Sequence, residues 1–498
     1  MNPRLHLLLL LTATTYCSAQ VKSLGQNISY MGEVNMTASS NSDVAPFWFT
    51  NNRYGLSSSE GNSGYFRAAI LRDLSADSTR NWHMGYGADI VVPVNHTSDF
   101  FIQQLYAQVE YKAFLLTLGV KELSMPFNNR ELSSGDMVIG SNARPIPQVR
   151  LEMPDYWNIP GTHKWLGIKG HAAFGWYTDN NWQEETTQGK KLYSNNSLFH
   201  SKSLFFRIGR EDRFPLTYEG GLQIATQFGG EVWNVSQRAD DTNPDFSSHV
   251  KMDNGLSSYF NALFVGGGDP NDGNYKNVEG NHVGSWYGSL TYHHSGWSVR
   301  GYFEHLFEDH SQLFLQYGWK DMTWGLEAHL PKNPVVSTVV MELLSTKDQT
   351  GGIYHDKTDN LPVQISGKDN YYQNHIYGGW QHWGMSTGNP LIISPIYNNN
   401  GSISTQHSRI KAVHVGISGD PSESLHYRIL YTYMRSWGNY DAPLTNTKDD
   451  QFLLAELTYK SSHFKGWSAT AAAGLNHGSI ISNSTGLSLT IRKEGLIR

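Results

Sequence analysis

The sequence predicts an all-β fold, a transmembrane antiparallel β-barrel of about 16 to 18 strands. Three observations support this prediction. The chain begins like an exported protein, it combines 13% aromatic residues with only 16% charged residues, and most of it consists of short runs in which apolar and polar residues alternate. A barrel wall requires alternation with a period of two, because one side chain faces lipid and the next faces the lumen.

The first 19 residues have the layout of a secretory signal peptide. Arg4 supplies a positive start, Leu5–Leu11 an apolar core, and Cys17–Ala19 the small residues before the cleavage point. We therefore expect the mature chain to begin near Gln20 and to reach the Gram-negative outer membrane. The alternative is a lipoprotein acylated at Cys17, although the residues before this cysteine do not fit that pattern.

Composition excludes several classes of protein. Cys17 is the only cysteine, so the mature chain can form neither a disulfide nor a thiolate metal site. Loss of Arg4 with the signal changes the formal charge from −6 to −7, which does not favour nucleic acid as a partner. After the signal, no apolar run approaches the roughly 18 residues of a spanning helix. Strands remain as the means of crossing a membrane.

Strand candidates follow one another from residue 64 to the end of the chain, and we assign residues 64–498 to the barrel. In the run Trp297–Glu308, a mostly aromatic and aliphatic face alternates with a mostly polar face. A soluble β-sandwich or propeller would show the same alternation. The predicted strands are 64–74, 81–94, 99–111, 114–122, 164–178, 204–212, 218–230, 286–294, 297–309, 321–330, 335–347, 409–418, 425–437, 451–460, 467–477 and 485–494.

The connections favour the membrane barrel. Short and long connections alternate in the second half of the chain, as they do in barrels with tight periplasmic turns and long outer loops. If the last strand runs inward, counting backwards places the segment 123–163 on the periplasmic side. We expect residues 20–63 to form a periplasmic or first-strand segment. The predicted outer loops are 179–203, 231–285, 348–408 and 438–450.

The segment 123–163 contains the stretch Ser141–Trp157, in which three prolines interrupt any regular ladder. A wide barrel encloses an aqueous channel unless it is filled. We therefore expect this segment to fold into the periplasmic mouth as a plug. A pair of unrecognised strands is the alternative. The residues expected to pair with polar groups of the lumen are Arg144, Arg150, Glu152 and Asp155.

Three motifs carry a resemblance to a known family. Ala45–Leu56 (APFWFTNNRYGL), Gly119–Leu123 (GVKEL) and Asn142–Leu151 (NARPIPQVRL) resemble the capsule assembly protein Wzi family of Gram-negative outer membranes. The resemblance implies a barrel of about 18 strands, plugged by helical segments on the periplasmic side. Ile28–Ala38 alternates and could supply one of the two missing strands. The end of the chain, Gly495–Arg498, departs from the terminal aromatic residue common in barrels.

The same resemblance implies a lectin-like function without enzymatic activity. The expected partner is capsular polysaccharide or exopolysaccharide, which the protein would help to attach and assemble at the cell surface. Outer-membrane lipid surrounds such a barrel, and the polysaccharide export machinery is a further candidate partner. We consider two rivals, a gated porin or solute transporter and an enzyme that modifies lipid or glycan.

Motifs for catalysis are weak, and we expect no cofactor or metal ion. Ser386 lies in a G-x-S-x-G string, but this string belongs to a long loop rather than to a strand followed by a helix. Asp269–Asn274 resembles a calcium loop but places its glycine at the wrong position. Both motifs are interpreted as coincidences of a glycine-rich sequence.

Tryptophans in the predicted outer loops are the better candidates for binding, because aromatic rings stack on the C–H faces of sugars. Tryptophan also forms the interfacial girdles of any barrel, and we assign Trp297 and Trp437 to these girdles. The predicted sugar-stacking residues are Trp182, Trp380 and Trp383.

Overall fold

The computed structural model describes residues 24–77, 82–123, 125, 127–236, 247–268, 278–308, 320–331, 333–355 and 365–497. The expected signal peptide, the cleavage point near Gln20 and the loop Asp269–Asn274 lie outside these residues. Within the described ranges, no helix is long and apolar enough to cross a membrane.

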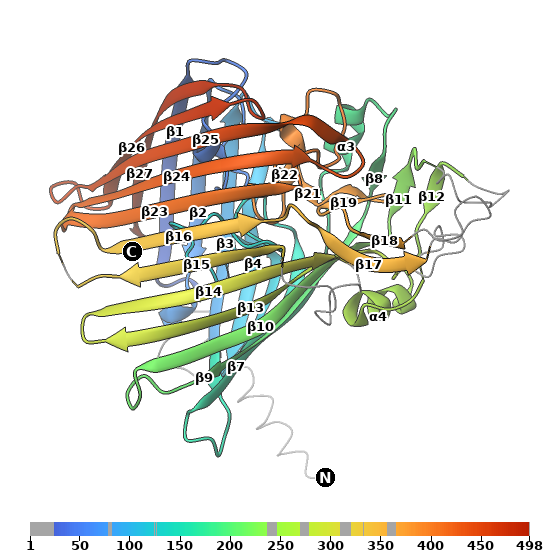
Figure 1. Ribbon diagram of the computed structural model, residues 1–498. Helices are drawn as coiled ribbons and strands as arrows, with labels where there is room; N and C mark the ends of the chain where they lie inside the picture. The colour runs from blue at the N-terminus through green and yellow to red at the C-terminus, as the bar shows by residue number, and fades with distance from the viewer. Residues whose placement is uncertain are drawn as a thin grey trace, which may run out of the picture.

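The chain forms an antiparallel sheet of 18 strands that closes into a barrel (Figure 1). Closure is direct, because the first strand pairs with the second and also with the last. The predicted fold class is confirmed. The strands are β1 (Ile28–Ser39), β2 (Ser63–Arg72), β3 (Trp82–Val94), β4 (Phe101–Tyr111), β5 (Phe114–Val120), β6 (Gln148–Asn158), β7 (Leu166–Trp176), β9 (Leu198–Ile208), β10 (Leu216–Phe228), β13 (Asn281–His294), β14 (Trp297–Glu308), β15 (Met322–His329), β16 (Thr338–Ser345), β23 (Ile410–Ser422), β24 (Leu425–Gly438), β25 (Pro443–Lys460), β26 (Trp467–Gly478) and β27 (Ser484–Ile497).

Two of these strands were absent from the sixteen predicted ones. One is β1, for which Ile28–Ala38 was the candidate. The other is β6, which runs through the proline-rich stretch. Its pairing with β7 is irregular between Met153 and Trp157, so Pro154 lies where the ladder is already interrupted. A proline at such an irregularity gives up no ladder hydrogen bond, which is why its presence did not prevent a strand.

Because β6 adds one strand to the count, every strand before it runs in the direction opposite to the predicted one. The insertion between β5 and β6 is residues 121–147, and it leaves the barrel at the end opposite both termini. The expectation of a plug spanning 123–163 and joined at the end of the termini is therefore wrong. We call the end that carries the termini the terminal end, and the opposite end the loop end.

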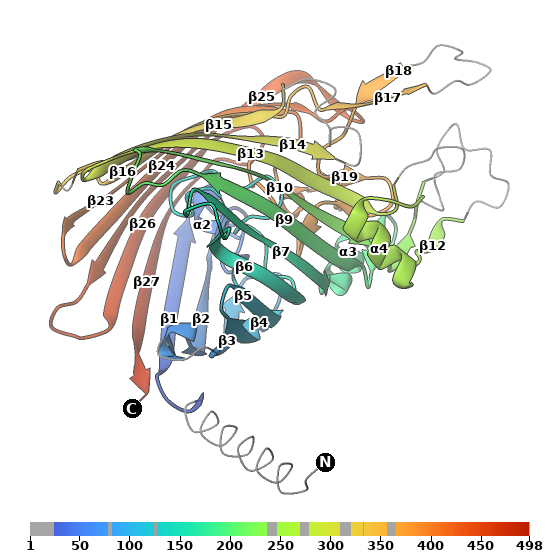
Figure 2. The ribbon, with the colours of Figure 1, turned by 90° about the horizontal axis from the view of Figure 1, so that it is seen from below.

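The loop end also carries the other long connections (Figures 1 and 2). They include the residues between β7 and β9, between β10 and β13, and between β16 and β23. The predicted outer loop 438–450 is wrong in length, because β24 ends at Gly438 and β25 already begins at Pro443. The short elements of the structure are α2 (Phe47–Thr50), η1 (Leu74–Asp77), α3 (Asn180–Thr187), β8 (Tyr193–Asn195), β11 (Glu231–Trp233), β12 (His249–Lys251), α4 (Leu256–Phe264), β17 (Thr350–His355), β18 (Ile365–Lys368), β19 (Gln373–Asn374), β20 (Gly378–Gly379), β21 (Gln381–His382), β22 (Met385–Ser386) and η2 (Pro395–Tyr397).

The outer wall of the barrel exposes large apolar side chains. Phe66 is 51% exposed, Leu204 is 59% exposed and Leu326 is 52% exposed, while their neighbours along each strand face the lumen. A protein surrounded by water rarely presents so continuous an apolar band, whereas a barrel in a bilayer requires one. The alternation seen in the sequence is this division between lipid and lumen.

Three segments fill the loop-end half of the lumen, and together we call them the plug: residues 41–62, 121–147 and 369–409. Their apolar side chains form one core with the inner faces of the surrounding strands. Phe47 of α2, for example, stacks on Phe452 of β25 with ring centroids 4.1 Å apart. The plug has little helix, so the expectation of helical plug segments is also wrong.

Candidate functional site

Hydrogen bonds join the segments of the plug to one another. The Trp380 Nε1 donates to the Val138 carbonyl at 2.9 Å, and the Tyr372 hydroxyl donates to the Met137 carbonyl. The Asn389 Nδ2 donates to the Gly135 carbonyl at 2.7 Å. Residues more than 200 positions apart in the chain therefore form one body inside the barrel.

Carboxylates of the wall hold the plug in place. Glu304 of β14 accepts a hydrogen bond from the Met137 backbone N–H at 2.8 Å, and Glu342 of β16 accepts one from the Ser134 N–H at 2.7 Å. Asp136 lies between these contacts in the sequence and is fully buried. Burial raises the pKa of Asp136 well above its usual range, and the Glu304 charge raises it further.

Arg144 is buried between the plug and the β3–β4 connection and pairs with uncharged groups rather than with an acid. Its Nη2 donates to the His96 Nδ1 at 3.0 Å and to the Thr97 Oγ1 at 2.9 Å, and its Nη1 donates to Ser98. The guanidinium also lies over the Phe101 ring, 4.0 Å from its centroid. Burial lowers the pKa of Arg144 to about 9 and the pKa of His96 to about 3, so His96 is a neutral acceptor.

The other predicted plug residues belong to the barrel wall. Arg150 and Glu152 both lie on β6 and pair with each other, with the Arg150 Nε 2.8 Å from the Glu152 Oε2. Asp155 is exposed, within the irregular part of the same strand. These three residues therefore lie on β6, which begins at Gln148, and not in the plug. Arg150 and Glu152 alternate with the exposed Val149 and Leu151, so they do face the lumen, as predicted, and pair there with each other.

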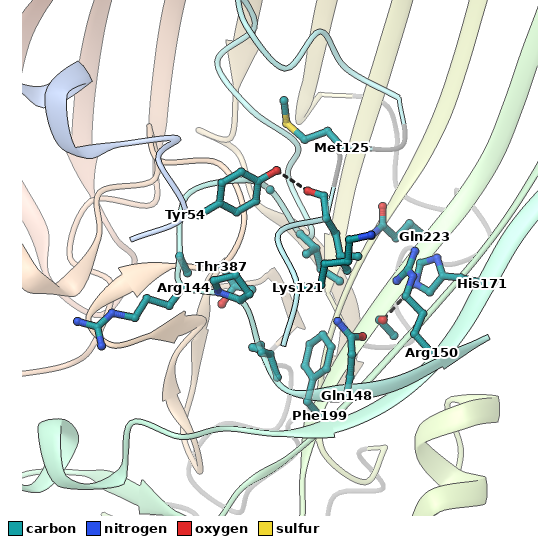
Figure 3. Close-up of a pocket in the computed structure, with 17 residues that line it drawn as sticks. Tyr54, Lys121, Met125, Arg144, Gln148, Arg150, His171, Phe199, Gln223 and Thr387 are labelled. Carbon is teal, nitrogen blue, oxygen red and sulfur yellow. Dashed lines mark hydrogen bonds between the residues drawn. The ribbon is translucent and has the colours of Figure 1, made fainter. Parts of the chain in front are cut away.

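A small cavity of about 60 Å³ lies between the plug and the wall (Figure 3). Tyr54 and Arg144 approach it from the plug, and Gln148 and His171 from β6 and β7. The Tyr54 hydroxyl donates to the Leu123 carbonyl within the plug. The cavity can hold a few water molecules and is too small for a sugar ring.

A much larger cavity, of about 580 Å³, occupies the terminal-end half of the lumen below the plug. Its lining is polar and carries both signs of charge. Glu456 of β25 is 2.6 Å from Arg53 of the plug and 2.8 Å from Arg428 of β24, and Arg492 is 2.6 Å from Glu33. The ion pairs join residues of neighbouring strands and join the plug to the wall, and such a charged lining favours water over apolar packing in this half.

The loop-end surface carries a cluster of aromatic residues from separate segments. We call Trp182, Tyr193, Trp233, Trp383 and Ile403 the cap cluster, because they pack together above the plug. The Trp233 ring is parallel to the His249 ring, with centroids 3.6 Å apart. The cluster thus brings together Trp182 and Trp383, two of the three predicted sugar-stacking residues.

Trp383 has an unusual backbone conformation. Its φ is +55°, a left-handed conformation that costs a bulky residue about 1 kcal/mol or more. Its backbone N–H donates to the Asp179 Oδ2 at 3.1 Å, and the Arg144 guanidinium lies 4.5 Å from its ring centroid. These contacts fix a partly exposed indole at the surface. Strain maintained in this way is typical of functional positions.

Two candidates from the sequence are excluded by burial. Trp380 is 0% exposed and belongs to the plug core, so it has no face for a sugar. Trp182 is 8% exposed, and its ring packs against Gly384. Trp233 is the partly exposed partner that the prediction omitted. No periodic signal distinguishes these tryptophans, because all lie in the connections between wall strands, and only packing decides which ring is covered.

The weak catalytic motif does not form a nucleophile site. Ser386 is 0% exposed, its hydroxyl donates to the Ile392 carbonyl at 3.1 Å, and it ends the two-residue strand β22. A nucleophile elbow instead exposes its serine between a strand and a helix. Among the described residues, no three His, Cys, Asp or Glu side chains are grouped so as to hold a metal ion.

Comparison with known proteins identifies the class of fold. No family model matches the chain, and no curated protein matches it by sequence. Among solved structures, the chain is similar to Wzi of Escherichia coli, described as an outer membrane protein involved in group 1 capsule assembly and a carbohydrate binding β-barrel. The TM-score is 0.56 at 11% identity, over 96% of this chain and 86% of that one.

Porins of Pseudomonas aeruginosa are more distant. OprD matches with a TM-score of 0.46 at 9% identity, over 95% of this chain and 96% of that one. OccK1 (OpdK) matches with a TM-score of 0.47 at 10% identity, over 95% of this chain and 99% of that one. The closed barrel of 18 strands with its apolar outer band is the fold of outer-membrane β-barrels.

Proposed function

We propose that this protein is a non-conducting outer-membrane barrel that binds capsular polysaccharide or exopolysaccharide and helps to attach it at the cell surface. The plug is the observation that carries the proposal. A barrel of this width would otherwise enclose an aqueous channel. Here Trp380, Leu391 and Ile392 of the plug are fully buried against the wall. A lumen closed in this way leaves the loop-end surface to meet a large ligand.

The cap cluster provides the chemistry that a sugar chain needs. Trp383 and Trp233 are partly exposed rings, and rings of this kind stack on apolar sugar faces. Amide side chains lie in the same connections. The Asn234 Nδ2 already donates to the Gly189 and Lys191 carbonyls, and the Asn180 Nδ2 donates to the Asn196 Oδ1 at 3.0 Å, so an amide oxygen such as that of Asn234 would accept from a sugar hydroxyl. The surface combines stacking and hydrogen bonding within one region.

The description of Wzi as a carbohydrate binding barrel supports the same proposal. We further propose that the polymer is delivered by polysaccharide export machinery, and that the role is binding rather than catalysis. The buried hydroxyl of Ser386 supports the second point, because a substrate could not reach it.

The test measures binding of the purified protein to surface polysaccharide extracted from the cells that produce the protein. Trp383→Ala should weaken binding about 5- to 30-fold, because a stacked aromatic ring contributes on the order of 1–2 kcal/mol. The matched control is Trp467→Ala, which removes an exposed ring at the terminal end. If wild type and Trp383→Ala bound the polysaccharide equally well, the cap cluster would not be the binding site.

A gated porin is the second candidate, and the charged cavity of about 580 Å³ favours it. A solute could occupy this half of the lumen if the plug moved. Planar-bilayer recording separates the two functions. The binding proposal expects no steady current through the wild-type barrel, whereas reproducible openings with a preferred ion or solute would identify a porin.

A further inference from the structure

A groove of about 570 Å³ runs across the outside of the barrel at the loop end, over the adjacent strands β15, β16, β23 and β24. Its lining divides into two kinds of side chain. Trp324, Leu343 and Val413 supply an apolar floor, and Lys320, Lys411 and Arg435 supply cations. This groove is separate from the lumen and from the cap cluster.

Alternation along the strands shows that the groove faces lipid. Val340 and Leu344 of β16 belong to the core of the lumen, so Leu343 between them points outward. Leu343 is 48% exposed and Trp324 is 54% exposed. Lys411 is the second residue of β23, and Lys320 lies two residues before β15, so both cations lie at the loop-end rim. The groove thus has charges at the rim and an apolar surface beneath them.

The charges of the groove are unbalanced. Arg435 forms a two-pronged ion pair with Asp449, in which both N···O distances are 2.7 Å, and the Tyr433 hydroxyl donates to the same carboxylate at 2.9 Å. In the part of the chain that the structure describes, neither Lys320 nor Lys411 forms an ion pair. Lys347, which lies 5.0 Å from the centroid of the Trp437 ring, adds another cation beside them.

We propose that this groove binds a phosphorylated, multiply acylated lipid of the outer leaflet. Its phosphates would be held by Lys320 and Lys411, and its acyl chains would lie along Trp324, Leu343 and Val413. Lysine is a common phosphate ligand, and basic pockets on membrane proteins bind anionic head groups. Four adjacent strands span about 14 Å, which is wide enough for several acyl chains side by side. Cations at the rim above an apolar floor match a charged head group above acyl chains, whereas a protein partner would not require this order.

Native mass spectrometry of the full-length protein in a neutral detergent tests the proposal. The probe is diphosphorylated, hexa-acylated lipid A, and the comparison lipid is the same molecule with both phosphates removed. The double variant Lys320→Ala/Lys411→Ala should bind the phosphorylated lipid roughly thirtyfold more weakly than wild type. Binding of the dephosphorylated lipid should be weak and equal for both proteins.

The matched control is Lys112→Ala/Lys465→Ala, which removes two exposed lysines from turns at the terminal end. It should bind lipid A as wild type does. Equal loss in the control would show a general charge effect, and equal binding by wild type and the groove variant would overturn the proposal. Trp324→Ala should weaken the binding of both lipids, because it removes part of the apolar floor. If Trp324→Ala changed neither, the acyl chains would lie elsewhere and the groove assignment would be wrong.

Discussion

The two halves of the lumen are enclosed by the same strands, yet they are filled in opposite ways. The loop-end half is packed with apolar side chains, with Trp380 and Leu391 at 0% exposure. The terminal-end half contains a charged cavity of about 580 Å³. The connections explain the difference, because those at the loop end include the long segments 121–147 and 346–409. The wall sets the width of the lumen, and the insertions decide whether it is open.

The two halves also differ in the contacts that hold their charged residues. In the packed half, Arg144 is buried beside the partly exposed Trp383 ring. In the half with the large cavity, Glu456 lies between Arg53 and Arg428. Changes in the packed half should therefore have large effects, and equivalent changes in the hydrated half should have small ones.

Removal of the plug segment between β5 and β6 should produce the largest effect. Replacing residues 124–146 with a short Gly–Ser linker opens the packed half while leaving β6 intact. Single-channel conductance in planar bilayers should rise at least about tenfold, because a wide barrel then encloses water. The control is the heat-dependent gel mobility of the variant, which shows that the barrel still folds. An intact variant barrel that stayed closed would show that the plug does not seal the lumen.

A pair of single substitutions tests packing in the two halves. Trp380→Ala should reduce the free energy of unfolding by about 3–5 kcal/mol, since it leaves a cavity in the plug core. Arg492→Gln removes an ion pair in which the arginine is 41% exposed and Glu33 is 5% exposed. It should cost less, about 1–2 kcal/mol, because the Tyr65 hydroxyl still donates to Glu33. Chemical denaturation followed by tryptophan fluorescence measures both. Similar losses for the two variants would contradict the difference between the halves.

Asp136 should give a smaller effect that depends on pH. Because burial raises its pKa above the usual value of 3.8, the folded state binds more protons than the unfolded state. Stability should therefore fall as the pH rises from about 4 toward the raised pKa. Asp136→Asn should reduce this dependence, and its free energy of unfolding at pH 8 should exceed that of wild type by roughly 1 kcal/mol.

The difference between wild type and Asp136→Asn should shrink as the pH falls toward about 3, below the ordinary pKa of 3.8, where the carboxyl is protonated in both states. Heat-dependent gel mobility over this pH range measures it. Asp155→Asn removes the same charge from an exposed position and should behave as wild type at each pH. An Asp136 variant no more stable than wild type at pH 8 would mean that the carboxyl is not held neutral.

Sequence reasoning recovered most of the wall and less of the site. Alternation is a local signal, so strands such as Trp297–Glu308 could be placed within a few residues. β6 was missed because Pro154 is normally evidence against a strand, and a single missed strand reversed the direction assigned to the insertion. Trp380 was misassigned because a buried and an exposed tryptophan have the same sequence context in a loop.

The sequence by itself determined that this chain is a cysteine-poor β-barrel with an apolar outer band, since each strand carries its own division between lipid and lumen. Only the tertiary structure decided where the plug enters, which rings remain exposed and which half of the lumen holds water. The physical reason is the separation along the chain of the residues that interact. Alternation acts between neighbouring residues, whereas contacts such as Trp380 with Val138 or Glu304 with Met137 join positions more than 160 residues apart.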